Sequence, residues 1–410
     1  MLNSMKKTKF CFVALLVALT LIPADSYACT SAIISGRITP DGRPLLWKHR
    51  DTDCLENRVD YIGRSKDIKY AFVAVVSATT KGGTSWMGTN EAGFSIINTA
   101  SRNMHRYEED DKDQEGTLMY KALSCCRNLA DFEAFLDGNK PLCVQTNFGV
   151  IDAEGGAAYY ETNSYEWTKV DVNDPTAAPL GYKVYTNFST TGTTDGGGGY
   201  IRYANANETL EQFVLGNGKV TPKWVFDNLS RSFRQPLVGI DLIRNPELAP
   251  SGWYYDMDFI PRKSTASAAV IKGVKPGENP LLSTMWVVLG YPPVSVAVPV
   301  MVAAGDKQPS VTSRISAEDG RCPIACAAME RRAEVFPIKR GSGPHYLHFS
   351  VLYNEQGTGY MQRLAPIEEQ IFRKFEDLQD NWYKTGEVRL PELRNFYNNT
   401  DFGMSTVSNH

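Results

Sequence analysis

The pattern of hydrophobic and polar positions divides the chain into an apolar leader, a long series of strands and a helical end. Between residues 29 and 190, apolar residues form short runs separated by turn formers such as Pro40-Asp41-Gly42, which is typical of antiparallel strands. These runs predict strands at 33–34, 45–48, 70–77, 143–152, 157–162 and 182–188, and a hairpin over 85–100 that turns near 91–93. Cys29 then begins the first strand, which is an anchored position.

Apolar residues at helical spacing predict the remaining elements. We expect helices over 117–136, 202–215, 221–231 and 366–384, and further strands within 284–303. Asn128 is a candidate helix cap that interrupts the first of these helices. The last helix is amphipathic, so we expect a C-terminal helical segment that packs on the body of the protein. Runs of strands followed by runs of helices favour stacked layers over a doubly wound parallel sheet.

The first 28 residues have the three regions of a secretory signal. Three lysines precede an apolar run from 10 to 22, and small or polar residues follow up to Ala28. The run is shorter than the roughly 18 residues that a membrane span needs. We therefore expect residues 1–28 to be removed, and residues 29–410 to form a single domain without a membrane span, exported to a bacterial periplasm or secreted.

Composition and charge narrow the classes of partner. The formal net charge is -3 on 410 residues, with acids and bases interspersed, which excludes a polycationic face for a nucleic acid backbone. The eight cysteines leave disulfides and free thiols open as alternatives. Neither Cys322 with Cys326 nor His345 with His348 has the tight spacing of a zinc site. We expect no nucleic acid, metal or cofactor, and the sequence leaves a homo-oligomer open.

The residues before Cys29 are compatible with two kinds of processing. Ser26 and Ala28 are small residues where ordinary signal peptidase requires them, and its cut leaves Cys29 with a free α-amine. The alternative is a lipoprotein, in which Cys29 is acylated and anchors a binding protein. Lipoprotein signals usually have an aliphatic residue where this chain has Ser26 and a small residue where it has Tyr27. This departure favours the free cysteine.

A free N-terminal cysteine combines a nucleophile with its own base. An ordinary thiol, with a pKa near 8.5, is mostly protonated at neutral pH. An α-amine has a pKa near 7.7 to 8.0, so it can take the thiol proton and later return it to a leaving group. The chain has only five histidines, so few residues could serve as the histidine of a cysteine-histidine pair. Cys29 is therefore the candidate nucleophile.

Four blocks of sequence after the leader carry a resemblance to a known family. They read "CTSAIISGRITPDGRPLLWKHRD" from Cys29, "TNEAGFSIINT" from Thr89, "TNFGVIDAEGGAAYYET" from Thr146 and "YTNFS" from Tyr185. In this order they resemble the N-terminal nucleophile (Ntn) hydrolases with cysteine, within the group of choloylglycine (bile salt) hydrolases, penicillin V acylase and isopenicillin-N acyltransferase. The resemblance implies an α+β fold, a four-layer αββα sandwich of two antiparallel sheets between helices. It also implies hydrolysis of a linear amide other than a peptide bond, through a thioester on Cys29.

The same resemblance assigns roles near the first hairpin. Asp51 matches the aspartate that holds the α-amine, where charge pairing would tune the base. The family's arginine stands three residues before that aspartate, where this chain has Lys48, while Arg50 stands directly before it. We assign the cationic role to Arg50 and keep Lys48 as the alternative.

Three further positions match functional residues of the family. Asn187 matches the asparagine whose side-chain N–H donates to the tetrahedral oxyanion, and Asn98 matches a position that lines the oxyanion hole. Arg202 matches an arginine found beyond that asparagine. The alternatives are turn formers at strand ends for the asparagines and a solvated residue at a helix start for Arg202. Asn147 lies in a similar "TNF" sequence, and we take it to be structural.

The sequence therefore predicts an exported cysteine amidase of the Ntn type. Its substrate is a small-molecule amide, with an N-acyl bond between a hydrophobic acyl group and a small amine or amino acid, as in a conjugated bile salt. If an amine outcompetes water at the thioester, the protein is an acyltransferase. An Ntn dipeptidase shares the opening "ACT", and Gly42 and Asp51 fit that alternative too. The alternative that is not an enzyme is the lipoprotein anchored through Cys29.

Overall fold

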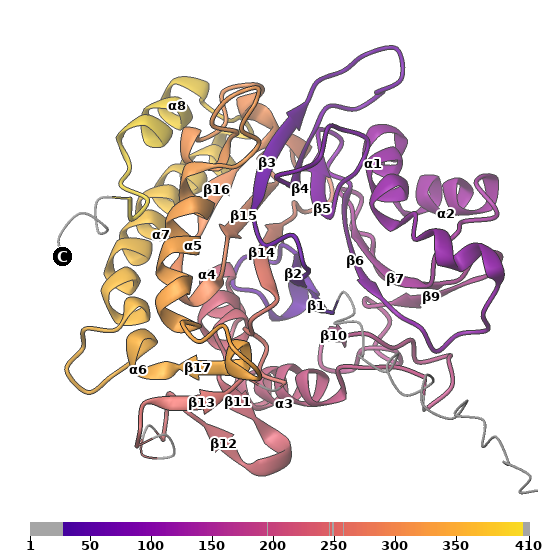
Figure 1. The fold of residues 1–410 in the computed structure, drawn as a ribbon. Coiled ribbons are helices and arrows are strands. Elements are labelled where there is room, and N and C mark those ends of the chain that lie inside the picture. The colour runs from indigo at the N-terminus through magenta and orange to yellow at the C-terminus, as the bar shows by residue number, and fades with distance from the viewer. Residues whose placement is uncertain (1–27, 195, 246, 248–249, 257, 405–410) are drawn as a thin grey trace, which may run out of the picture.

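The computed structural model describes residues 28–194, 196–245, 247, 250–256 and 258–404. The predicted signal, residues 1–28, lies outside this part of the chain except for Ala28. Two antiparallel sheets are stacked between two sets of helices (Figure 1). No helix of the described residues has the length and apolar character to cross a bilayer.

The first sheet contains six strands in the order β10-β1-β2-β14-β15-β16. They are, in this order, Tyr182–Tyr185, Cys29–Ile34, Leu45–Asp51, Thr265–Lys272, Thr284–Leu289 and Val298–Val300. The predicted hairpin of β1 and β2 is confirmed, and its register pairs Cys29 with Arg50. The expected strands within 284–303 are β15 and β16. The sequence did not predict β14, which pairs with β2 and brings a late segment beside the Cys29 hairpin.

The second sheet contains seven strands, β3 to β9, in sequential order. They are Asn57–Ile62, Phe72–Ser77, Met87–Asn90, Ser95–Ala100, Thr146–Ile151, Ala157–Thr162 and Trp167–Asp171. The hairpin predicted over 85–100 is β5 and β6, and the predicted strands at 70–77, 143–152 and 157–162 are confirmed as β4, β7 and β8. Strands β6 and β7 contact β1 and β2, so the two sheets face one another.

Two helices cover the outer face of the second sheet. They are α1 (Glu115–Cys125) and α2 (Leu129–Gly138), and Asn128 caps the second because its side chain accepts a hydrogen bond from the backbone N–H of Asp131. Successive side chains of β4 point to opposite faces of the second sheet. Phe72 belongs to the apolar cluster under α1 and α2, whereas Val73 belongs to the larger core between and beyond the sheets. The predicted interruption of the helix at Asn128 is confirmed.

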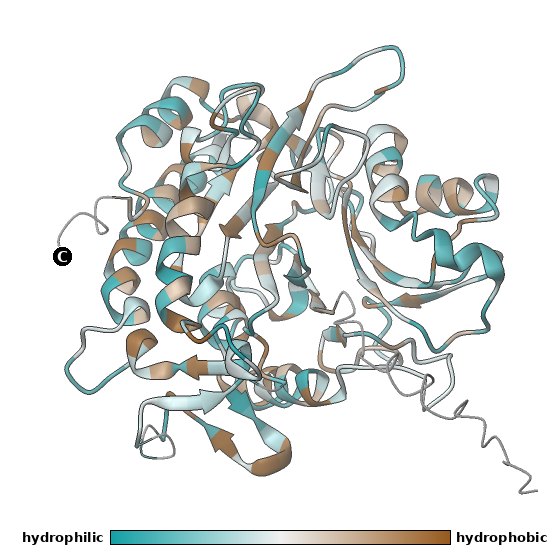
Figure 2. Cartoon of the chain, in the orientation of Figure 1, coloured by the Kyte–Doolittle hydropathy of each residue, from teal (hydrophilic) through white to brown (hydrophobic). Residues whose placement is uncertain are grey.

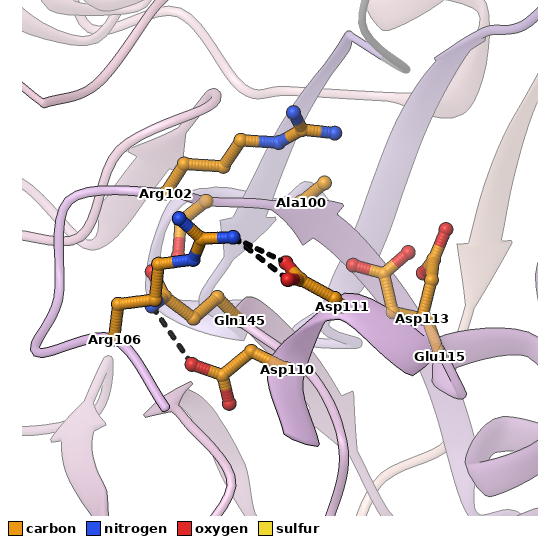
Figure 3. A pocket seen from close by; sticks show the side chains of 9 residues that line it. Ala100, Arg102, Arg106, Asp110, Asp111, Asp113, Glu115 and Gln145 are labelled. Atoms are coloured by element: carbon orange, nitrogen blue, oxygen red, sulfur yellow. Dashed lines mark hydrogen bonds and ion pairs between the residues drawn. The ribbon is translucent and has the colours of Figure 1, made fainter. Parts of the chain in front are cut away.

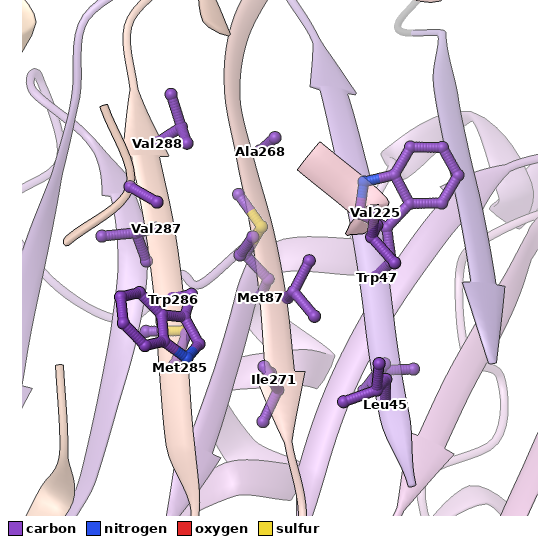
Figure 4. Close-up of a cluster of buried hydrophobic side chains, with 14 of the residues drawn as sticks. Leu45, Trp47, Met87, Val225, Ala268, Ile271, Met285, Trp286, Val287 and Val288 are labelled. Carbon is purple, nitrogen blue, oxygen red and sulfur yellow. The ribbon is translucent and has the colours of Figure 1, made fainter. Parts of the chain in front are cut away.

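The remaining helices cover the other face of the first sheet. They are α3 (Tyr200–Leu215), α4 (Pro222–Val225) with a π-helical turn over Phe226–Ser230, α5 (Pro323–Val335), α6 (Phe349–Leu352), α7 (Tyr360–Thr385) and α8 (Leu390–Asn399). Trp286 of β15 stacks on Phe372 of α7 at 4.0 Å between ring centroids, and Figure 4 shows Trp286 in this core with Trp47 and Val225. Along α7, hydrophobic and hydrophilic residues alternate as expected for an amphipathic helix (Figure 2). The closing helix is confirmed, and it is longer than predicted.

Short elements complete the chain. Two small antiparallel ribbons pair β11 (Arg234–Gln235) with β12 (Ile240–Asp241), and β13 (Trp253–Tyr255) with β17 (Tyr346–His348). Single 3-10 turns lie at Gly36–Ile38, Glu108–Lys112, Pro236–Val238, Pro280–Leu282, Pro292–Val294, Val302–Ala304, Ser310–Thr312 and Gly343–His345. The helix, sheet, sheet and helix layers confirm the predicted αββα sandwich.

Candidate active site

Cys29 begins β1 and lies between β10 and β2. The residue is buried, with 5% of its surface exposed. Along β1, the Ser31 hydroxyl lies on Tyr159 of the facing sheet, and Cys29, two residues before it, shares this face. The thiol therefore faces the space between the two sheets, on a rigid strand at the end of the chain that the predicted cut would create.

The backbone nitrogen and carbonyl of Cys29 are held by a residue that follows β10 and by a residue of α3. The nitrogen donates to Oδ1 of Asn187 at 3.2 Å, and the same oxygen accepts from Nη2 of Arg202 at 2.7 Å. Nη1 of Arg202 donates to the Cys29 carbonyl and to the Thr30 hydroxyl, both at 2.7 Å. Burial, and then the positive charge of Arg262, lower the pKa of Arg202 to about 10. The structure thus brings three of the predicted site residues together.

The four-glycine run before α3 positions Arg202. Gly198 pairs with Asn187 through two backbone hydrogen bonds, of 2.9 and 3.2 Å. Gly199 precedes α3 with φ of 78°, and a Cβ there would lie 2.4 Å from Nη2 of Arg202. This run therefore supports the site, because Gly198 pairs with Asn187 and Gly199 leaves room for the Arg202 guanidinium.

Replacing Gly199 by alanine is expected to destabilise the protein. The substitution combines a left-handed backbone with the clash on the Arg202 guanidinium, which we expect to cost about 1 to 3 kcal/mol in the free energy of unfolding. Denaturant unfolding measures the change. Gly138→Ala in α2 is the matched control, because its Cβ would meet no atom within 4 Å; equal unfolding midpoints for the two variants would contradict the assignment.

Asp51 follows Arg50, the residue of β2 that pairs with Cys29, so its side chain lies on the face of the sheet opposite to Cys29, towards the helices. Its backbone N–H donates to the Ala28 carbonyl at 3.0 Å. Its carboxylate accepts from the Thr265 hydroxyl at 2.6 Å and forms an ion pair with Arg262 at 2.9 Å. In this uncut chain the nitrogen of Cys29 is bonded to Asn187, so the predicted role of Asp51 in holding the α-amine stays a prediction.

Lys48 and Arg50 share the face of β2 that carries Cys29, because residues two apart on a strand point the same way. Nζ of Lys48 donates to the Trp86 carbonyl at 2.9 Å and to Oδ1 of Asn98 at 2.5 Å. Burial lowers the pKa of Lys48 to about 8, against the opposing effect of the Cys29 thiolate. Arg50 donates to Asn57 and lies over the Trp86 ring at 4.4 Å.

The two asparagines of the TNF sequences have different surroundings. Nδ2 of Asn187 donates to the Ala100 carbonyl at 2.8 Å, at the end of β6. Asn147 bonds to the Thr99 hydroxyl, the Phe188 carbonyl and the Ser189 hydroxyl, so it ties β7 to the segment after Asn187. Asn98 bonds to Lys48 and Thr146. The oxyanion roles of Asn187 and Asn98 stay predictions, whereas the contacts of Asn147 are structural ones.

A polar cavity of about 420 Å³ opens beside Ala100. Every lining residue except Ala100 is polar or charged: Ser101, Arg102, Arg106, Asp110, Asp111, Asp113, Glu115 and Gln145. Figure 3 shows Arg106 paired with Asp111, at 2.7 Å for the shorter contact. Because Ala100 binds the Asn187 amide, the cavity lies two hydrogen bonds from the Cys29 nitrogen.

Several residues of the site had no signal in the sequence. Arg262 and Thr265 lie after the last block of sequence that resembles the family, and the pairing of β14 with β2 brings this part of the chain to Asp51. Glu115 begins α1 and looks like an ordinary first-turn acid, although it is buried. Among the described residues, no group of three or more His, Cys, Asp and Glu side chains is placed to hold a metal.

Of the comparisons with known proteins, only the one with solved structures finds proteins that are similar to this chain. No protein-family model and no curated protein matches the chain. An N-acylethanolamine-hydrolyzing acid amidase ortholog from Caenorhabditis elegans is 14% identical with a TM-score of 0.41, covering 60% of this chain and 92% of that one. Penicillin V acylase from Agrobacterium tumefaciens is 14% identical with a TM-score of 0.41, covering 67% and 86%. A variant of conjugated bile acid hydrolase from Clostridium perfringens is 13% identical with a TM-score of 0.39, covering 67% and 93%. At these identities and scores the similarities assign no function.

Proposed function

We propose that this protein is an exported cysteine amidase that hydrolyses a linear amide through a thioester on Cys29. The observation that carries the proposal is the Asn187–Arg202 clamp, which fixes both the nitrogen and the carbonyl of Cys29 at the start of a buried strand. Every buried backbone N–H and carbonyl needs a partner, but here two side chains that bind each other, Asn187 and Arg202, serve both groups of one residue. A residue whose nitrogen becomes the general base needs such support, because base and nucleophile must keep a fixed geometry.

The chemistry follows from this arrangement. After the cut before Cys29, the α-amine takes the thiol proton and the thiolate attacks the carbonyl carbon of the amide. The tetrahedral oxyanion accepts a hydrogen bond from the Asn187 side chain, and the α-ammonium returns its proton to the leaving amine as the C–N bond breaks. Water then attacks the thioester with the α-amine as base, which releases the acid and restores Cys29.

The contacts support Lys48 in the cationic role that the sequence assigned to Arg50. The charge of Lys48 acts on the Cys29 thiolate, and its amine is anchored by Trp86 and Asn98. Arg50 is engaged with Asn57 and the Trp86 ring. We therefore propose that Lys48 is the cation that stabilises negative charge on Cys29 or on the oxyanion.

Export with an ordinary cut is the processing that this function needs. Burial of Cys29 supports it, because a lipid-modified thiol between two sheets would displace the facing strand. We propose a periplasmic or secreted protein whose Ala28 carbonyl, now bonded to the Asp51 N–H, leaves with the signal.

The polar cavity beside Ala100 is our proposed place for the hydrophilic part of the substrate. No hydrogen bond or ion pair joins the Arg102 guanidinium to any other described residue, and Figure 3 shows it across from Asp113 and Glu115. A free guanidinium matches a carboxylate, so an N-acyl amino acid fits with its amino acid part in the cavity and its hydrophobic acyl group outside it. The charged lining also favours a second candidate, a dipeptidase that binds a zwitterionic dipeptide.

Replacing Arg102 by methionine is expected to raise KM for an N-acyl amino acid by about tenfold or more. The reason is the loss of a charge-assisted hydrogen bond to the carboxylate, roughly 1.5 to 3 kcal/mol. The matched substrate is the same compound with its carboxylate converted to an amide, for which wild type and variant should have similar KM values. Arg340→Met, on an exposed arginine away from the cavity, is the control variant. A KM that changes equally for both substrates would contradict the assignment.

Hydrolysis across a panel tests the proposed function. The mature protein is assayed with conjugated bile salts, N-acyl amino acids, fatty acid amides, penicillins and dipeptides, each with and without an amine acceptor. Release of acid from an N-acyl compound supports the amidase. Turnover of dipeptides alone supports the dipeptidase, transfer to the amine supports the acyltransferase, and no turnover on any class rejects all three on this panel.

A further inference from the structure

His49 is a buried histidine that the proposed reaction does not use. None of its surface is exposed, and it lies two residues before Asp51 on β2, so the two side chains share the helix side of the sheet. Nε2 of His49 lies 3.1 Å from the Thr265 hydroxyl and 4.0 Å from Oδ1 of Asp51. Thr265, at the start of β14, is also fully buried. A histidine, a threonine and an aspartate therefore meet behind the end of the strand that pairs with Cys29.

The contacts of Thr265 fix the direction of the hydrogen bonds at its hydroxyl. Its one proton goes to Oδ1 of Asp51, at 2.6 Å, because a carboxylate that is paired with Arg262 can only accept. The backbone N–H of Arg262 donates to the same hydroxyl oxygen at 3.0 Å. The contact with His49 must therefore be donated by its Nε2–H. Burial lowers the pKa of His49 to about 4, so the ring is neutral and carries its proton on Nε2.

These bonds hold the Asp51 carboxylate from both sides. Oδ1 accepts from Thr265, and Oδ2 accepts from Nε of Arg262 at 2.9 Å, so each carboxylate oxygen has a donor. Only 1% of the surface of Asp51 is exposed. Its backbone N–H donates to the Ala28 carbonyl at 3.0 Å, which places Asp51 beside the peptide bond that the predicted cut would break. The orientation of this carboxylate is therefore set by buried donors rather than by water.

We propose that His49 and Thr265 are positioning residues of the Cys29 site, which act through Asp51 by holding its carboxylate towards the α-amine. His49 orients the Thr265 hydroxyl, and the hydroxyl orients the carboxylate. Without the N–H of His49, the Thr265 oxygen loses a buried donor and the hydroxyl is free to turn from Asp51. The inference rests on the proposed function, in which Asp51 holds the α-amine, and adds two residues that touch neither substrate nor nucleophile in their proposed role.

The charges around the Cys29 nitrogen give the direction of the effect. A carboxylate favours the charged form of a neighbouring amine, so an aligned Asp51 raises the pKa of the α-amine, as the Cys29 thiolate does. The cations nearby lower it, and Asp258 acts on the last two of them: Lys48, Arg50, Arg202 and Arg262. When the Asp51 carboxylate loses its alignment, the pKa of the α-amine therefore falls.

Removing either donor is expected to lower the pH midpoint of the α-amine. Thr265→Val and His49→Met should each move it down by about one pH unit, the lower end of what a close opposite charge contributes. The double variant should move it no further than Thr265→Val alone, because His49 acts through the hydroxyl. Thr265→Ser and His49→Gln keep the hydroxyl and an N–H donor, so they should keep the wild-type midpoint. Thr312→Val is the control, because it removes an equally buried hydroxyl, which bonds to the Pro309 carbonyl.

The experiment measures the α-amine of the mature protein and these variants between pH 6 and pH 10. The thiol is capped with methyl methanethiosulfonate, and the rate of acetylation by acetic anhydride is followed by the mass of the N-terminal peptide. On the uncapped protein, the rising limb of kcat/KM for the best amide of the panel should show the same displacement, since the neutral amine is the proposed base.

The labelling needs no turnover, so it tests the inference even if no amide is hydrolysed. Coincident midpoints for wild type and both donor-removing variants, or a double variant whose displacement is the sum of the single ones, would overturn the inference. A displaced midpoint in Thr265→Ser or Thr312→Val would overturn it as well. The two donor removals are independent, so one suffices if the other variant does not fold. A peptide that retains residues 1–28 would overturn the inference together with the proposed function.

Discussion

Replacing Cys29 by alanine is expected to lower kcat/KM by more than about 10³-fold, with little change in the melting temperature. The expected loss is large because the variant lacks the proposed nucleophile, so that the proposed thioester cannot form. The expected change in stability is small because the side chain loses a single sulfur atom at the end of a strand whose backbone contacts remain. Steady-state kinetics and thermal unfolding measure the two effects. Cys29→Ser distinguishes a weakened nucleophile from an absent one.

The control for this prediction is another cysteine. Cys125→Ser changes an exposed thiol at the end of α1, remote from the clamp, and should keep kcat/KM within about twofold. If Cys29→Ala kept wild-type activity while an alkylating agent inactivated it, a different thiol would be the nucleophile. The proposed mechanism would then be wrong, although the fold would stand.

Replacing Asn187 by alanine is expected to lower kcat by about 10² to 10³-fold. Removal of a donor to an oxyanion has this magnitude, roughly 2.7 to 4 kcal/mol of transition-state stabilisation. The loss also includes positioning, because Oδ1 of Asn187 joins the Cys29 nitrogen to Arg202. The effect should appear in kcat more than in KM, since the oxyanion exists only after attack.

Asn147→Ala is the matched comparison, because the two asparagines occupy similar TNF sequences. Its bonds join strand β7 to the Phe188–Ser189 segment, so we expect a lower melting temperature with a change in kcat of less than about tenfold. If the two variants lost kcat equally at equal stability, Asn187 would have only a structural role.

The fold was predictable where local pattern carries the information. The hairpin of β1 and β2, the capped start of α2 at Asn128 and the amphipathic α7 follow from turn residues, a cap and helical spacing, and all three are confirmed. Strand β14 was not predicted, because its residues read as a small-residue run, "TASAAVIK", and its partner β2 lies more than 200 residues away. Pairing at such a separation is set by the assembled sheet and leaves no local signal.

The site was predictable to a smaller extent. Cys29, Asn187 and Arg202 lie together in the structure. They could be singled out from the sequence because Cys29 and Asn187 are in blocks that resemble the family and Arg202 follows at the start of a predicted helix. The order of Lys48 and Arg50 along β2 could not decide which one takes the proposed cationic role, because both side chains share one face of the strand. Their partners differ only in the assembled structure, where Lys48 binds Trp86 and Asn98 and Arg50 binds Asn57. Glu115 had no signal at all, since its burial depends on how α1 covers β5 and β6.

The intact mass of the purified exported protein, before and after thiol alkylation, tests the central claim most directly. We predict a chain that begins at residue 29, with an unmodified cysteine that takes one alkyl group at its thiol and has a free α-amine. Retention of residues 1–28, or a diacylglycerol on Cys29, would contradict the account, because neither species has the N-terminal thiol and amine on which the proposed reaction depends.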